Sequence, residues 1–194
     1  MVRARASKDA LTYLDRVDPE GARKVRRRFP RHSLATIENA STNALVSINH
    51  DRYLAGAWLP VFGMEQALEH LAGASLETIG SPLLRPLLQG SMRLLGASPR
   101  SIVHVVPRTW SLVYHDFCAP KVRDTDLYTA RVDFEDVHPL VFDHPAYFLV
   151  WRGLFHGIFK MAGHRGDAAM TVDRDRHLVV AELQWTKLET DQSA

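Results

Sequence analysis

One stretch of the chain, HPAYFLVWRGLFHGIFKMAG at positions 144–163, limits most strongly what the protein can fold into. It is almost continuously apolar or aromatic, and about 20 apolar residues are enough to cross a bilayer. Arg152, His156 and Lys160 interrupt it. Because each central Arg or Lys costs roughly 2.5–3.5 kcal/mol on insertion scales, a membrane span is disfavoured.

The three interrupting side chains are spaced four apart, so on a helix they form one narrow basic stripe. The rest of the circumference would be a broad buried face made of Tyr147, Phe148, Trp151, Leu154, Phe155, Ile158, Phe159 and Ala162. We predict a core helix over 145–162, with Asp143 as its N-cap and Gly163 just past its end. Gly153 and Gly157 lie on one side of it, where a missing side chain allows another backbone to approach closely.

Composition places the chain in an ordinary class. Its 194 residues suffice for one well-packed domain, and 46% apolar and 24% charged residues are typical of soluble globular proteins. The net charge of +2 requires no nucleic acid or acidic partner. No apolar segment follows MVRARASKDA, so no signal peptide is expected. A single cysteine, Cys118, excludes an internal disulfide and a cysteine-based zinc site, which fits a cytoplasmic protein.

Up to about residue 110 the apolar pattern has the helical period. It predicts helices over 8–17, 34–48, 60–72 and 82–95. Pro60 suits the first turn of the third helix, and Gly96 suits the end of the fourth. Ser98 and Pro99 then indicate the N-cap and first position of a further helix.

After residue 110 the period falls to two, which is typical of strands. Strands are predicted in WSLVYHDF and LYTARVDFEDV before the helix 145–162, and in AAMTV and HLVVAELQW after it. Ala130, Val132 and Phe134 should face the core from the second strand, and Val179, Ala181, Leu183 and Trp185 from the last. The order predicts an α+β fold, with a helical N-terminal half packed on a small twisted antiparallel sheet of β-β-α-β-β order.

We predict a single domain over residues 1–194. It would consist of a basic helical extension (1–30), a helical half (31–109), a sheet-plus-helix half (110–187) and a disordered tail (188–194).

Several segments of the chain resemble a known family. LLRPLLQGSMRLLGASPRSI, WSLVYHDF, YTARVDFEDV, the stretch 144–163 and HLVVAELQW are similar to segments of a set of small myxobacterial proteins of unknown function. Those in turn resemble the fold shared by haem–nitric oxide binding domains, 4-vinyl reductase domains and the Bet-type subunits of the TRAPP vesicle-tethering complex. The resemblance covers roughly residues 45–187. It implies a ligand-binding domain of the nitric-oxide-signalling or Golgi-transport type, or a scaffold, with a hydrophobic pocket between the helices and the sheet.

Haem-binding members of that fold ligate iron through a histidine on the helix before the GASP-like turn, and hold the propionates with a Tyr-x-Ser-x-Arg motif. Here Leu87 stands near the position of that histidine. Tyr128 and Arg131 are three residues apart rather than four, with Ala130 between them. Because haem needs an axial ligand, a haem-binding gas sensor is the disfavoured alternative, and no cofactor is expected.

Histidines and the single cysteine are candidate chemical groups. His138 and His144 lie near Asp136 and Asp143, but each histidine precedes a proline, which suits turns at least as well as metal binding. No metal is expected. His115 and Cys118 would fall on opposite faces of a strand, which weakens a Cys–His pair, so a place in or near the core is the preferred interpretation of Cys118.

A basic run, ARKVRRRFPRH, is the sharpest charge feature. Its cations are Arg23, Lys24, Arg26, Arg27, Arg28 and Arg31. They could meet phosphates or an acidic partner, but a solvated helix face is favoured, because no groove-reading motif accompanies them. Nucleic-acid binding is therefore disfavoured.

The leading hypothesis is a non-enzymatic cytoplasmic module that binds a small apolar molecule, a protein partner or a second copy of itself. An enzyme with His115 or His138 as acid or base, and a dimerisation scaffold without a ligand, stay open. A pocket is expected between the concave face of the sheet and the first-half helices. Its expected lining is Trp58, Phe62, Leu87, Met92, Val132, Phe134, Trp151 and Phe155, with Tyr114, Tyr128 and Arg131 as polar anchors.

Overall fold

The computed structural model describes residues 1–82, 84–124 and 126–187. In chain order the elements are β1 (Val2–Arg3), α1 (Ala4–Val17), α2 (Pro19–Arg28), α3 (Arg31–Asn39), β2 (Leu45–Val46), α4 (Ile48–Asp51), α5 (Tyr53–Ile79), α6 (Arg85–Leu95), α7 (Pro99–Val103), α8 (Val106–Val113), β3 (Ala119–Asp124), β4 (Thr129–Glu135), the 3-10 turns η1 (Pro139–Val141) and η2 (Pro145–Tyr147), α9 (Phe148–Met161), β5 (His164–Asp173) and β6 (Leu178–Lys187). The predicted tail, 188–194, lies outside the described residues.

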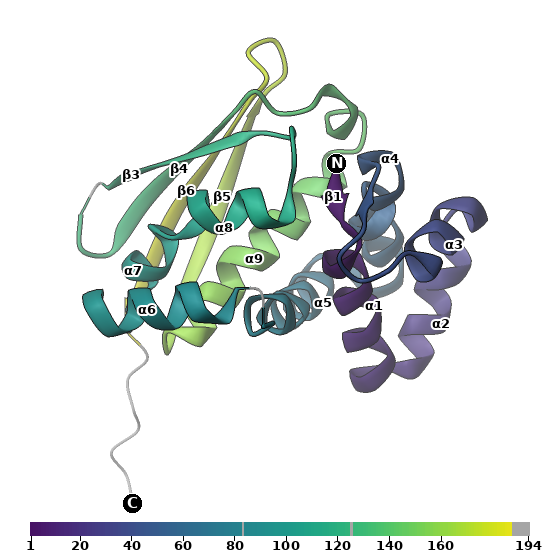
Figure 1. Ribbon diagram of the computed structural model, residues 1–194, viewed down its shortest axis with the longest axis horizontal. Helices are drawn as coiled ribbons and strands as arrows, with labels where there is room; N and C mark the ends of the chain where they lie inside the picture. Colours follow the sequence, from purple (N-terminus) through teal and green to yellow (C-terminus); the bar gives the residue numbers. More distant parts are fainter. Residues whose placement is uncertain (83, 125, 188–194) are drawn as a thin grey trace, which may run out of the picture.

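The helices and the sheet occupy different ends of the molecule. Figure 1 shows α1 to α4 at one end and the four-stranded sheet at the other, with α5 and α9 between them. The sheet is antiparallel throughout, in the order β3-β4-β6-β5. The α+β class and the β-β-α-β-β order of the second half are therefore confirmed. Within the described ranges, no helix is long and apolar enough to cross a bilayer.

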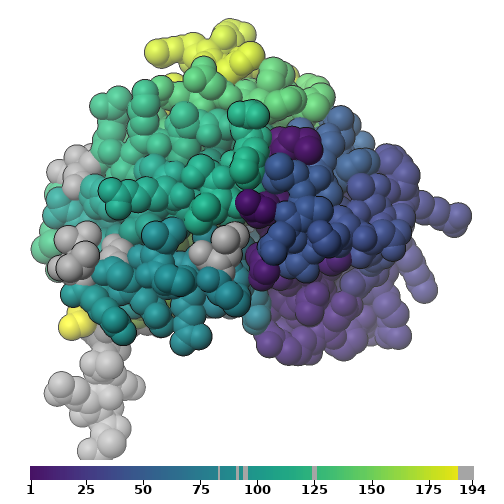
Figure 2. All heavy atoms as spheres, viewed as in Figure 1, coloured from purple at the N-terminus to yellow at the C-terminus, as the bar shows by residue number. Residues whose placement is uncertain are grey.

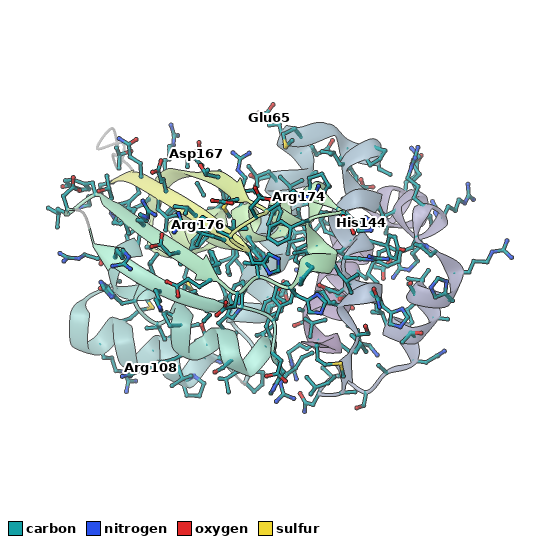
Figure 3. All side chains as sticks on the ribbon, turned by 90° about the horizontal axis from the view of Figure 1, so that it is seen from above. Glu65, Arg108, His144, Asp167, Arg174 and Arg176 are labelled. Atoms are coloured by element: carbon teal, nitrogen blue, oxygen red, sulfur yellow. The ribbon has the colours of Figure 1, made fainter. Side chains whose placement is uncertain are left out.

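One face of the sheet forms the main core. The side chains predicted to face inward from β4 and β6 are all buried. Helices α8 and α9 both cover this face, because Trp110 of α8 and Trp151 of α9 pack on Phe134, with ring centroids 5.0 and 4.4 Å away. Arg108, on the same helix as Trp110, points away from the protein (Figure 3).

Helix α9 has the predicted polar stripe. Arg152 and His156 lie 3.1 and 3.3 Å from a carboxylate oxygen of Asp167, which sits on the edge strand β5 (Figure 3), and Lys160 pairs with Glu69. The predicted cap was wrong, because no side chain caps the first turn, which is 3-10. Asp143 instead accepts a hydrogen bond from Arg174, at 3.0 Å.

The two glycines of α9 bring it against α5. A Cβ atom at Gly153 would lie 2.6 Å from the Cβ of Leu71, and one at Gly157 would lie 3.0 Å from the carbonyl oxygen of Ala72. Real side chains do not tolerate the first distance, so the predicted close approach is confirmed. The two helices touch along their main chains.

The strand predicted at 110–117 was wrong. Its first residues belong to α8, Val106–Val113, which has Pro107 at its start. An eight-residue run with Trp, Leu and Val fits either period, and the proline in the first turn decides for the helix. The change from helices to strands therefore comes after Val113 and not at residue 110.

The helix predicted over 34–48 was only half right. Helix α3 ends at Asn39, and β2 pairs with β1 at the chain start. The polar residues 40–43 separate the two, and Ser47 then caps α4 by accepting from the Asn49 amide. A pairing of two-residue strands from distant parts of the chain leaves no periodic signal in the sequence.

The remaining predicted helices are present, but their starts differ: α1 and α5 begin earlier than predicted, so Pro60 is not in a first turn, and α6 begins later, at Arg85. Helix α1 begins at Ala4. Pro60 lies inside α5, and the helix is interrupted at Gly63, which has φ 71°. The end of α6 at Gly96 and the start of α7 at Ser98 and Pro99 are confirmed, with Ser98 accepting from the Ser101 amide.

Candidate functional site

An apolar cavity of about 100 Å³ lies where α1, α5 and α9 meet the α6–α8 segment. Its apolar lining consists of Ala6, Ala10, Leu54, Leu71, Ala74, Ile79, Leu84, Leu88, Ile102, Val106, Trp110, Val113, Val150, Trp151, Leu154 and Ile158. Among the described residues, none from the four-stranded sheet lines it. Since a dry cavity of about 150 Å³ takes benzene or xenon, this one suits a molecule of that size or smaller.

Two tryptophans separate the cavity from the sheet. The rings of Trp110 and Trp151 meet edge to face, with centroids 5.3 Å apart. Their indole N–H groups are buried without a hydrogen-bond partner. The side of the cavity toward the sheet is therefore formed by two buried indole rings.

The described lining also contains polar residues, namely Asp51, Ser75, Thr78, Thr109 and Tyr114, and Asp51 is the carboxyl group among them. Asp51, at the end of α4, is only 2% exposed and lines the cavity. Its Oδ2 accepts a hydrogen bond of 2.8 Å from the Tyr147 hydroxyl, and its Oδ1 accepts one from the Ser7 hydroxyl. Elements α1, α4 and η2 thus meet at one carboxyl group.

Burial governs the protonation of this cluster. It raises the pKa of Asp51 and outweighs the opposing effects of the two hydroxyl donors and the N-terminal amine. Burial first, and then the negative charge of Asp51, raise the pKa of Tyr147 and of Tyr114. Both phenols therefore stay protonated at neutral pH, and Asp51 is the most acidic group of the three.

The residues predicted to line a pocket are dispersed. Trp151 and Tyr114 line the cavity. Val132, Phe134 and Phe155 are fully buried in the core between the sheet and α9. Their role in binding a ligand stays a prediction, and the cavity itself lies one layer away from the expected place.

The other predicted residues lie elsewhere. Trp58 and Phe62 belong to the second apolar cluster, formed by α1, α2, α3 and α5. Met92 is partly buried against the main core, whereas Leu87 and Tyr128 are 40% and 50% exposed. Arg131 pairs with Asp133 on the outer face of the sheet, at 2.5 Å.

Sequence reasoning missed Asp51, Ser7 and Tyr147 as a group. Tyr147 was expected only to fill the core, and no motif marks the other two. The carboxyl partners lie 44 and 96 residues away from Asp51, so only the folded chain brings them together.

The histidines have structural places. His138 accepts a hydrogen bond from the Leu140 amide, at 3.3 Å, and so caps η1. His144 packs its ring on Tyr53, with centroids 5.2 Å apart. Burial lowers the pKa of both. Throughout the described ranges, no three His, Cys, Asp or Glu side chains converge as a metal site would require.

Cys118 and the basic run lie outside the cavity. Burial raises the pKa of the Cys118 thiol to about 12, so the nucleophilic thiolate is suppressed at neutral pH. In the basic run, Arg26 makes two bonds to Asp15, of 2.6 and 2.7 Å, and Lys24 pairs with Glu20. These pairings accord with a solvated helix face.

Comparison with known proteins shows what fold this is. No family model matches the chain, and no curated protein matches it. An unliganded Fe(II) H-NOX protein from K. algicida matches with a TM-score of 0.64 at 8% identity, over 98% of this chain and 100% of that one. This chain has the H-NOX fold. An oxygen-binding H-NOX domain related to soluble guanylate cyclases matches with a TM-score of 0.53 at 11% identity, over 92% of this chain and 91% of that one.

At these identities the H-NOX likeness establishes the fold alone. It confirms the resemblance to the haem–nitric oxide binding fold. The myxobacterial family and the likeness to 4-vinyl reductase and TRAPP domains stay predictions.

The described residues do not fit haem. Leu87, near the expected place of the iron ligand, is exposed and has no ligating atom. The described cavity lining contains no His, Cys or Met, and its one phenol, Tyr114, is held protonated. Tyr128 and Arg131 lie away from the cavity. A space of about 100 Å³ is also far too small for a porphyrin.

Proposed function

We propose that this protein is a non-enzymatic binding domain that holds one small apolar molecule in the cavity between α1, α5, α9 and the α6–α8 segment. The observation that carries the proposal is the cavity itself, whose described lining is mostly apolar and includes the buried carboxyl of Asp51. Small-molecule sites are mostly apolar with a few placed polar groups. The H-NOX neighbours include an oxygen complex, which supports a small-ligand role for this fold.

Figure 2 shows the face on which the teal α6–α8 segment meets the purple and blue N-terminal helices. The cavity lies beneath this junction, since its lining comes from both sides of it. Several of its lining residues, among them Ala6, Ser75 and Leu154, are only half-buried.

Binding is favoured over catalysis by the chemistry of the lining. Asp51 and Tyr114 are the ionisable groups among its described residues, and the hydroxyl groups of Ser7 and Tyr147 that bond to Asp51 have no histidine beside them as a base. His115 and His138 do not line it. A cytoplasmic location and a protein partner or second copy that responds to the bound state are parts of the same proposal.

The first test is native mass spectrometry of the protein purified from its source, together with ¹²⁹Xe NMR. We expect a retained small molecule, or xenon binding when the cavity has been emptied. Ala74 lines the cavity, so Ala74→Leu should fill it and abolish xenon binding. Ala169 is exposed on β5, so Ala169→Leu is the matched control and should leave xenon binding unchanged.

The alternatives give different results. A dimer mass without ligand, and no xenon signal, would support the scaffold. Turnover in a screen of apolar substrates would support the enzyme.

A further inference from the structure

Asp51 lines the cavity and has no positively charged side chain as a partner among the described residues. Among the described residues, no Lys, Arg or His lines the cavity, and no ion pair joins Asp51. The nearest cationic influence is the amine of Met1, which is already bonded to the carbonyl of His115, at 2.8 Å. A buried carboxylate is strongly disfavoured unless it is paired, so this one either keeps a proton or awaits a cation.

The surroundings of Asp51 are arranged for the charged form. Ser7 donates to one carboxylate oxygen and Tyr147 to the other, and donors of this kind stabilise the anion. A carboxylate oxygen accepts more than one hydrogen bond, so each keeps a lone pair for a ligand. Trp110 and Trp151 line the same cavity and present aromatic rings, which attract cations as well as hydrocarbon.

Resting on the function proposed above, we propose that the ligand is a small apolar amine, whose ammonium group pairs with the Asp51 carboxylate while its hydrocarbon body fills the space toward Trp110 and Trp151. An anion would be repelled by the carboxyl. A neutral hydrocarbon would make no polar contact with the carboxyl. A ketone or ether could accept a hydrogen bond from Asp51 only when the carboxyl is protonated.

These ligand classes differ in their pH dependence. The titratable groups around Asp51 are Tyr147 from η2, Tyr114 at the end of α8 and the N-terminal amine beside β1. Burial raises the pKa of Asp51, and an ammonium ligand requires its ionised form. Amine binding therefore releases the proton of Asp51, and affinity rises with pH. For a ketone, affinity falls with pH.

The experiment compares three molecules of one shape, isobutylamine, isobutanol and isopentane, by NMR titration of the full-length protein between pH 5 and 8. We expect isobutylamine to bind at least about tenfold more tightly than isopentane at pH 7, with an affinity that increases with pH. In Asp51→Asn this preference should vanish while isopentane binding stays. Asp133→Asn, which removes the other buried aspartate, should leave the preference intact.

The wild-type series needs no variant, so misfolding of Asp51→Asn does not weaken the test. Isopentane binding as tight as isobutylamine, or an amine affinity that is flat with pH, would overturn the amine proposal and leave the cavity function standing. If xenon and all three molecules fail to bind, both proposals fall.

Discussion

Asp51 and Asp133 are both buried carboxyls, at 2% and 6% exposure, but their pKa values are shifted in opposite directions. On the outer face of the sheet, burial alone would raise the pKa of Asp133, but Arg131 and Arg123, at 2.5 and 2.9 Å, lower it below its usual value. Asp51 receives only hydroxyl donors, and burial raises its pKa.

Asp133 carries a charge that is already paired within the protein, whereas the carboxyl of Asp51 has no charged partner in the part of the chain that the structure describes. Asp133 holds neighbouring strands together, because Arg123 comes from β3 and Arg131 from its own strand. Asp51 also joins elements, through Ser7 and Tyr147, but both of these partners are neutral and it lines a cavity. A buried ionisable group without a charged partner, in a cleft, is the pattern expected at a functional site.

The largest effect on stability is expected at Trp151, which lies between the cavity beside Asp51 and the sheet that carries Asp133. Trp151 lines the cavity on one side and packs on Phe134, the neighbour of Asp133, on the other. Trp151→Ala should lower the free energy of unfolding by about 3–5 kcal/mol, measured by urea denaturation, because it removes a large buried ring. A loss of less than about 1 kcal/mol with loss of ligand binding would instead make Trp151 a ligand contact more than a core residue.

The second expected effect is a pH dependence at Asp51. Because its pKa is raised in the folded state, the native protein holds the proton longer than the unfolded chain. Wild-type stability contributed by this group is therefore lost as pH rises from about 4, the unfolded pKa, through the folded pKa. Asp51→Asn should gain stability relative to wild type over that window, measured by urea denaturation at several pH values. A constant difference would contradict the pKa direction.

Asp133 should show the opposite slope and a smaller effect. Its folded pKa is lowered, so its stabilisation is present above the unfolded pKa and is lost as pH falls through the folded one. Since both arginines are partly exposed, Asp133→Asn should cost only about 1 kcal/mol at pH 7. The same denaturation series measures it, and a cost that grows on acidification would refute this account.

The smallest effects on stability and binding should come from substitutions at Leu87 and Tyr128, which are both exposed. Leu87→Ala and Tyr128→Ala should each change the free energy of unfolding by less than about 0.5 kcal/mol and leave xenon binding unchanged. Loss of binding in either variant would restore these two residues to the candidate site.

Local signals account for what the sequence predicted well. The helix over 145–162, its glycine side, the end of α6 at Gly96 and the alternation in β4 are all encoded within a few residues. The strand expected at 110–117 failed because a short apolar run carries no reliable period.

The cavity could not be predicted from local sequence, because its lining depends on how distant segments pack. Leu84, just before α6, and Leu88 within it are buried and line the cavity, whereas Leu87 is exposed. Only the packing of the helix determines which of these leucines faces inward. Trp151 and Tyr114 could be chosen for their size. Asp51 could not, because its burial depends on α1 and η2 closing around it.

Gly153 and Gly157 fix one dimension of the cavity. Along this seam α5 and α9 meet main chain to main chain, and Leu71, Val150 and Leu154 beside it also line the cavity. Helices already in contact cannot approach further, and packed interiors resist being parted. Side-chain changes can therefore reshape the space but not alter its width at the seam. The other side of the cavity is lined by side chains from the α6–α8 segment, so a change in its size has to come from there or from α1.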